Sequence, residues 1–158
     1  MKRNAMIMLL MFAAVGLMAF TAKNTRPDLK SQLPGEWRNV YVKITVHNKN
    51  KAAPAIMEAD SSNWQARLGI QPIRTHFLED GTYYSEYRNA KDSLVRRPSG
   101  TWSLQNDSLI MTQLTPDKSV IKLQLKIVND HATFQGHIDF DGEGISNDEY
   151  YGIQKKFK

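Results

Sequence analysis

The chain has 158 residues, of which none is cysteine, and it carries a formal net charge of +5. Without cysteine there can be no disulfide, thiol catalysis, thiolate metal site or lipid-modified N-terminal cysteine. Basic residues are interspersed with acidic ones and form no basic stripe between aromatic residues, so we expect no nucleic-acid partner.

Residues 1–22 are predicted to form an export signal. Residues 1–4 are basic, and Ala5 to Phe20 is an uncharged apolar run, shorter than the roughly 20 residues that a membrane-spanning helix needs. Thr21 and Ala22 are small enough for cleavage after either residue. The alternative is a retained membrane anchor. Cleavage would leave a periplasmic or extracellular chain that begins at Lys23, has a net charge of +3 and makes no further membrane contact.

The remaining chain suits one domain, residues 33–158, behind a polar, flexible lead-in over 23–32 in which a helical turn can start at Asp28. The domain opens with a Pro-Gly turn that delivers Trp37 to the head of a strand. From Val40 to Val46 apolar and polar residues alternate, which places the apolar set on one face of a sheet. Trp37 is out of phase with these valines, and this predicts a bulge at Arg38-Asn39.

A long connecting segment, residues 49–72, follows the first strand. Residues 62–65 have the spacing of a capping box with Ser62 as the N-cap, and Trp64 and Leu68 share one helical face. Gly69 can end the helix and Pro72 prevents its continuation. We therefore expect a short amphipathic helix over residues 62–68, packed by its tryptophan.

From Pro72 onward the pattern is strand and turn. Tight turns are predicted at Asp80-Gly81, Asn106-Asp107 and Asn129-Asp130, and an extra strand segment fits Leu94-Val95. The seven further strands are predicted over residues 73–79, 82–88, 100–104, 109–114, 121–127, 132–140 and 149–157.

An all-β fold with eight strands in succession favours an antiparallel up-and-down barrel, with the short helix between its first two strands. Closure into a barrel removes the two exposed edges that an open sheet would have. A two-sheet sandwich is the alternative, but the unbroken series of hairpins argues against its crossovers. The interior of an eight-stranded barrel is either filled by side chains or holds one small ligand.

Three phrases carry a resemblance to a known family. Gly35-Glu36-Trp37 resembles the G-x-W signature of lipocalins. Together with residues 77–83 and 100–104, it makes the chain similar to small secreted bacterial lipocalin-like, calycin-type domains. The resemblance implies a barrel in which Trp37 packs across the closed end. Lipocalins also carry a helix after the barrel, which is missing here, and often an arginine that stacks on the tryptophan, for which Lys155 or Lys156 could substitute.

The loop lengths predict where a ligand would bind. Tight turns gather at one end of such a barrel and long loops at the other, so the latter is the expected mouth. A small apolar or amphipathic ligand is expected there, with arginines that can meet an anionic head group. The alternative is a filled barrel, plugged by Trp64, that acts through its surface as a partner or inhibitor of another exported protein. The candidate binding residues are Trp64, Arg67, Leu68, Arg96 and Arg97, and the candidate structural residues are Gly35, Trp37 and Trp102.

Neither an enzyme nor a cofactor is expected. No serine lies in a G-x-S-x-G motif, and the histidines at positions 47, 76, 131 and 137 lack metal-ligand spacing. Residues 139–144 match the first half of an EF-hand loop, but the twelfth position is Tyr150 and no helices flank it. A solvated hairpin loop is therefore favoured over a metal site, and the sequence leaves calcium binding over residues 139–149 and the oligomeric state open.

Overall fold

The computed structural model describes residues 28–47 and 53–157, so the predicted export signal and most of the lead-in lie outside the described residues. Asp28 caps α1 (Leu29–Gln32) by accepting a hydrogen bond from the Lys30 amide, which confirms the expected helical turn. Among the described residues, no helix has the length and apolar character that crossing a bilayer requires.

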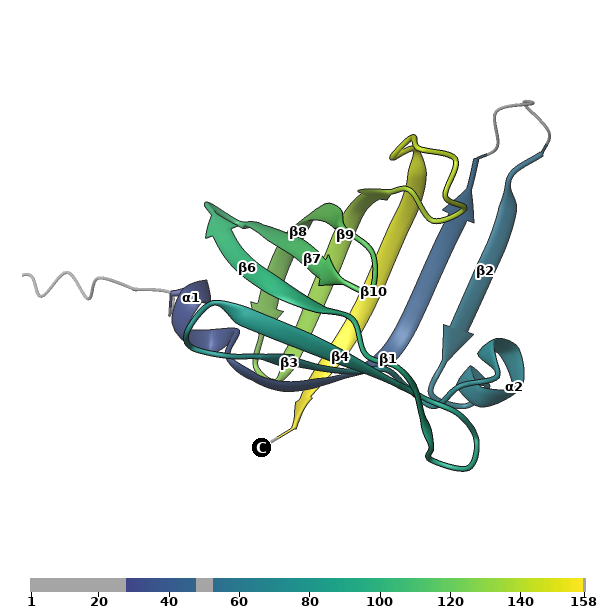
Figure 1. Ribbon diagram of the computed structural model, residues 1–158, viewed down its shortest axis with the longest axis horizontal. Helices are drawn as coiled ribbons and strands as arrows, with labels where there is room; N and C mark the ends of the chain where they lie inside the picture. Colours follow the sequence, from purple (N-terminus) through teal and green to yellow (C-terminus); the bar gives the residue numbers. More distant parts are fainter. Residues whose placement is uncertain (1–27, 48–52, 158) are drawn as a thin grey trace, which may run out of the picture.

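Eight antiparallel strands close into a barrel (Figure 1), because β10 pairs with β1. The predicted fold class is thereby confirmed and is consistent with a lipocalin-like fold, whereas the two-sheet sandwich is excluded. In ring order the strands are β1 (Gly35–Val46), β3 (Arg74–Phe77), β4 (Thr82–Arg88), β6 (Ser99–Gln105), β7 (Ser108–Thr115), β8 (Ser119–Val128), β9 (His131–Ile138) and β10 (Asp148–Phe157).

Two short strands lie off this ring. β5 (Leu94–Arg96) pairs with β4, as expected for Leu94-Val95. β2 (Ala55–Asp60) pairs with the second half of β1, whereas β3 pairs only with the first half. β2 was not expected, because the segment from Ala55 to Asp60 shows no apolar–polar alternation. It projects beside the barrel at the end where α2 (Trp64–Leu68) also lies (Figure 1).

The predicted bulge in β1 is present one residue later than expected. The register with β10 shifts between Asn39 and Tyr41, so Val40 is the extra residue. As a result Trp37, Asn39 and Val42 are all buried. In a regular strand Asn39 and Val42, three positions apart, would face opposite sides. The bulge therefore places a polar side chain in the barrel interior at Asn39.

The helix α2 lies between β2 and β3, as predicted, but its cap differs. Asn63 is the N-cap residue and makes no side-chain capping bond. Ser62 donates instead to the Asp60 carboxylate, with an Oγ–Oδ1 distance of 2.6 Å, so the expected capping box is wrong. Gly69 ends the helix in a left-handed conformation with φ of 69°, as predicted.

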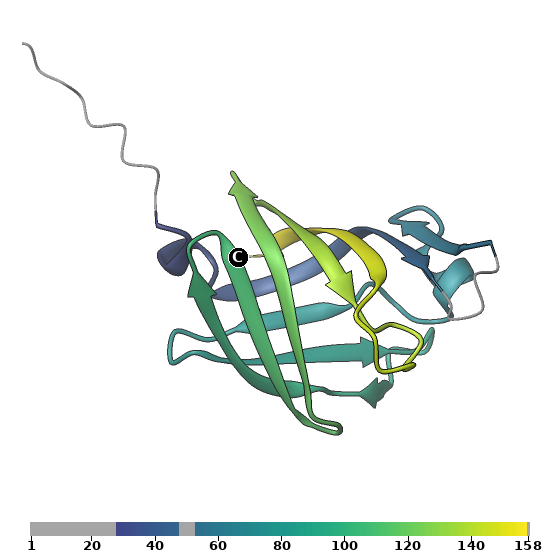
Figure 2. The ribbon, with the colours of Figure 1, turned by 90° about the horizontal axis from the view of Figure 1, so that it is seen from above.

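The two helices lie at opposite ends of the barrel (Figure 2). The closed end, near α1, carries the tight turns, where Asn106 and Asn129 adopt φ of 55° and 56°. Trp37 is fully buried there, and its Nε1 donates to the Leu33 carbonyl oxygen at 2.7 Å. Lys156 lies over the indole, with its Nζ 5.3 Å from the ring centroid, and donates to the Gln32 carbonyl oxygen. Of the two lysines considered for this stacking role, Lys156 is thus the one that contacts the indole.

Two further features hold the closed end together. A Cβ on Gly35, which has a φ of 133°, would lie 2.8 Å from Cε of Lys156, so glycine leaves the space that the lysine fills. Trp102 is buried, packs edge-on against Phe77 with centroids 6.1 Å apart, and donates from Nε1 to the Leu78 carbonyl oxygen at 3.0 Å.

Candidate functional site

A cavity of about 380 Å³ lies inside the barrel. It is bordered by two clusters of buried apolar side chains, one around Trp37 at the closed end and one around Trp64 at the mouth. Phe77, Phe134 and Phe140 line this space but do not fill it. The barrel is therefore hollow, and its cavity falls at the lower end of the 300–1,000 Å³ that is usual for small-molecule sites.

One wall of the cavity is apolar. It is built by the three consecutive strands β7, β8 and β9, together with Phe140, the second residue of the loop after β9. The lining side chains of this apolar wall are Met111, Ile121, Leu123, Phe134, Ile138 and Phe140.

The opposite wall carries polar groups. They come from β10, β1, β3 and β4, which are neighbours in the ring, so these groups form a continuous surface. The polar lining residues are Asn39, Thr75, Ser85, Tyr87, Tyr150 and Gln154.

Four of these residues, Asn39, Thr75, Ser85 and Gln154, form a polar belt across the four strands. Each is more than nine-tenths buried. Asn39 stands opposite Gln154 in the pairing of β1 with β10, and Thr75 stands opposite Ser85 in the pairing of β3 with β4. The two hydroxyl oxygens of Thr75 and Ser85 are 2.9 Å apart, whereas Gln154 Nε2 donates to Asn39 Oδ1 over 3.4 Å.

Two tyrosines extend the polar wall. Tyr150 lies across Gly152, where a Cβ would be only 2.6 Å from its hydroxyl oxygen, so glycine at this position is required by the ring. Burial raises the pKa of Tyr150 to about 12, Tyr87 adds to this rise, and the hydrogen bond with Asn39 opposes it. Burial also raises the pKa of Tyr87, against the opposing charge of Arg96. Both phenols are therefore neutral at physiological pH.

The mouth of the cavity is covered by α2 and the strands beside it. Trp64 and Leu68, both predicted to bind a ligand, line the cavity together. Trp64 is buried, and its Nε1 has no hydrogen-bond partner. Trp64 and Leu68 pack with four other apolar side chains that line the cavity at the mouth. We call these six residues the lid cluster, whose members are Val42, Ile44, Met57, Trp64, Leu68 and Ile73.

The three arginines proposed from the sequence do not line the cavity. Arg67 is exposed on α2. Arg96 lies 4.0 Å from the Asp117 carboxylate and 5.9 Å from the ring centroid of Tyr87. Arg97 covers the ring of Tyr84 at 4.2 Å. The structure thus brings the expected apolar residues to the cavity but leaves the cations on the outside.

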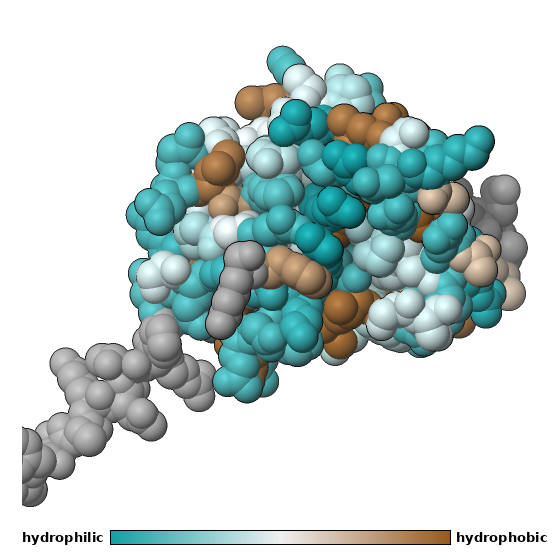
Figure 3. Space-filling model, turned by 90° about the horizontal axis from the view of Figure 1, so that it is seen from below, coloured by the Kyte–Doolittle hydropathy of each residue, from teal (hydrophilic) through white to brown (hydrophobic). Residues whose placement is uncertain are grey.

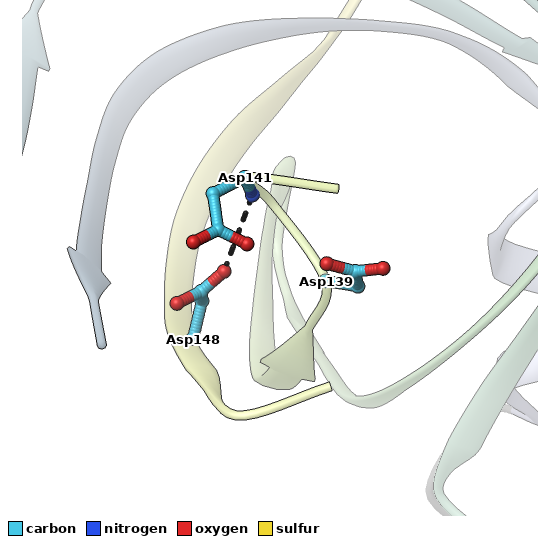
Figure 4. A group of neighbouring side chains, drawn as sticks. All are labelled: Asp139, Asp141 and Asp148. Atoms are coloured by element: carbon cyan, nitrogen blue, oxygen red, sulfur yellow. Dashed lines mark hydrogen bonds between the residues drawn. The ribbon is translucent and has the colours of Figure 1, made fainter. Parts of the chain in front are cut away.

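An acidic cluster lies where the loop between β9 and β10 meets the first residue of β10 (Figure 4). The carboxylate oxygens of Asp139, Asp141 and Asp148 lie within 4.8 Å of one another. Backbone amides occupy all three: Asp139 accepts from Gly144 at 2.9 Å, Asp141 from Glu143 at 3.1 Å, and Asp148 from three amides. These bonds give the carboxylates a role in shaping the loop.

The outer surface carries a shallower hollow across β1, β10, β9 and β8, lined mostly by polar side chains such as Lys43, Gln135 and Glu149. In the view from below, hydrophobic residues form several small patches within a mostly hydrophilic face (Figure 3). No protein-family model matches the chain, and no curated protein matches its sequence. The cavity and its lining are therefore the basis for a functional assignment.

Proposed function

We propose that the protein is an exported, non-enzymatic barrel of the small bacterial lipocalin-like kind, which binds a small apolar or amphipathic molecule in its interior. The cavity of about 380 Å³ is the observation that carries this proposal. Protein interiors are packed like organic crystals, with few voids larger than a water molecule. A cavity of this size leaves its apolar lining without packing partners, and a bound ligand would supply them.

The alternative of a filled barrel that acts through its surface is not adopted, because the interior is hollow. Apolar side chains from both ends and from one complete wall face the cavity, which favours a ligand with a large apolar part. No step of catalysis is proposed, because the polar residues of the cavity include neither a carboxylate nor an imidazole among the described residues.

A cavity-filling substitution tests the binding proposal. Ile121→Phe adds volume into the cavity from the apolar wall, so it should weaken binding of the neutral fluorescent probe N-phenyl-1-naphthylamine by about tenfold or more. The free energy of unfolding should change by less than about 1.5 kcal/mol, because the added atoms enter a void. Binding is measured as the rise in probe fluorescence.

The matched control is Val120→Phe on the same strand, where the side chain is 67% exposed and points away from the cavity. This variant should bind the probe as the parent does. Absence of probe binding to the parent protein, or equal weakening by both variants, would contradict an interior site.

Export is a separate proposal with its own test. Removal of residues 1–22 should yield a protein that begins at Lys23, which mass spectrometry of the exported fraction can establish. An intact Met1 in the membrane fraction would instead support a retained anchor.

A further inference from the structure

The polar belt lies at one defined depth in the barrel. Thr75 stands opposite Trp37 in the pairing of β1 with β3, and Asn39 is the next inward-facing residue of β1 after Trp37. The belt therefore sits directly beyond the closed-end core, at the deep end of the cavity. The lid cluster, at the other end, is made of apolar residues apart from the Trp64 indole nitrogen. A molecule that enters from the mouth passes the lid cluster and Tyr87 before it reaches the polar belt.

The polar belt leaves part of its hydrogen-bonding capacity unused. Thr75 and Ser85 share one hydrogen bond, which uses one of their two hydroxyl protons. Gln154 Oε1 has no partner, and the bond from Gln154 to Asn39 is long at 3.4 Å. Buried polar groups are destabilising unless they are hydrogen-bonded. A ligand that brings a further hydrogen-bond donor or acceptor to these residues is therefore favoured.

The cavity also lacks charge. Among the described residues that line it, none is Asp, Glu, Lys, Arg or His. An ionised group taken into such a site without a partner pays a large desolvation penalty. Arg96 and Arg97, which would be needed for an anionic head group, lie outside and contact Asp117 and Tyr84.

Building on the proposed function, we propose that the ligand is an uncharged amphipathic molecule with a hydroxyl or carbonyl group at one end. It binds with this polar end inward against the polar belt and Tyr150, and its apolar chain runs along the apolar wall toward the lid cluster. This orientation is the reverse of the one expected from the arginines, in which an acidic head group stays at the mouth.

Three probes of matched length test this proposal: 1-decanol, undecane and decanoate, the last held ionised at pH 8. Each is titrated into the 15N-labelled protein. The dissociation constant of 1-decanol should be lower than that of decanoate by about tenfold or more, because only the alcohol enters without a charge. The side-chain amide signals of Asn39 and Gln154 should shift with 1-decanol and much less with undecane.

Two belt variants test the orientation. Tyr150→Phe removes one cavity hydroxyl, and the double variant Thr75→Val/Ser85→Ala removes two hydroxyls that bond each other, so neither partner is left unpaired. Each should weaken 1-decanol binding by roughly two- to tenfold and leave undecane binding unchanged. Tyr151→Phe, an exposed phenol on the adjacent position of β10, is the matched control and should change neither.

The outcomes separate the two proposals. If all three probes bind equally, or if decanoate binds best, the interior site stands and the uncharged, polar-end-inward ligand is overturned. The same conclusion follows if the belt variants leave 1-decanol binding unchanged. If none of the three probes binds, the proposed function itself fails.

Discussion

Trp37→Ala is expected to lower the free energy of unfolding by about 3–5 kcal/mol, measured by urea denaturation. The indole is fully buried among the closed-end side chains, so its removal opens a large cavity that the rigid barrel cannot close. The substitution also leaves the Leu33 carbonyl oxygen without its donor and Lys156 without the ring beneath it.

The control for this result is Val128→Ala, which lies near the closed end but is 53% exposed and should cost no more than about 0.5 kcal/mol. The loss of unfolding free energy for Trp37→Phe should lie between the losses for Trp37→Ala and Val128→Ala, because phenylalanine retains an aromatic ring but lacks the Nε1 donor. A loss of less than about 1 kcal/mol for Trp37→Ala would show that the G-x-W tryptophan does not hold the closed end.

The barrel could be predicted from the sequence because its signals are local. Period-2 alternation places strands such as β8, and turns such as Asn129-Asp130 force the chain back beside itself. The eight ring strands follow from these two signals. β2 was missed because Ala55–Asp60 is a strand only through its pairing with β1, and that pairing is a tertiary contact.

The cavity could be predicted only in part, because its lining depends on how distant strands meet. Asn39 and Gln154 are 115 positions apart in the chain and become neighbours only when β10 closes onto β1. Whether Asn39 faces inward depends on the bulge at Val40, whose position the sequence located only to within a residue. A polar residue spaced two positions from Trp37 was the one available signal for the polar belt.

For Arg96 and Arg97 the position in the fold could be predicted from the sequence, but the direction of the side chains could not. Arg96 and Arg97 were placed near the mouth by loop length, and the structure does hold them in and next to β5. Loop length does not determine side-chain direction, and here both guanidinium groups lie over tyrosine rings on β4. A local stacking contact therefore replaces the long-range role that charge alone suggested.

The buried carboxylate of Asp148 is expected to be the other main determinant of stability. Asp148 is fully buried at the start of β10. Its Oδ1 accepts from the His47 amide at 2.8 Å, and its Oδ2 accepts from the amides of Phe140 at 2.7 Å and Asp141 at 3.4 Å. One side chain thereby ties the end of β1 to the loop that enters β10.

Asp148→Asn should lower the free energy of unfolding at pH 7 by about 2–4 kcal/mol, because an NH₂ group then faces amides that need an acceptor. Asp141→Asn, at an exposed position of the same cluster, is the control and should cost far less. Circular dichroism during urea denaturation measures both.

The pH dependence follows from the same bonds. Burial alone would raise the pKa of Asp148, but the amides of His47, Phe140 and Asp141 outweigh it and hold the pKa below its ordinary value near 3.8. A carboxyl group whose pKa is lowered by folding stabilises the protein above its unfolded pKa. That stability is lost as the pH falls from about 4 through the lower folded value. Between pH 7 and pH 3 the parent protein should therefore lose more stability than Asp148→Asn, and parallel curves would show that Asp148 is not a source of acid sensitivity.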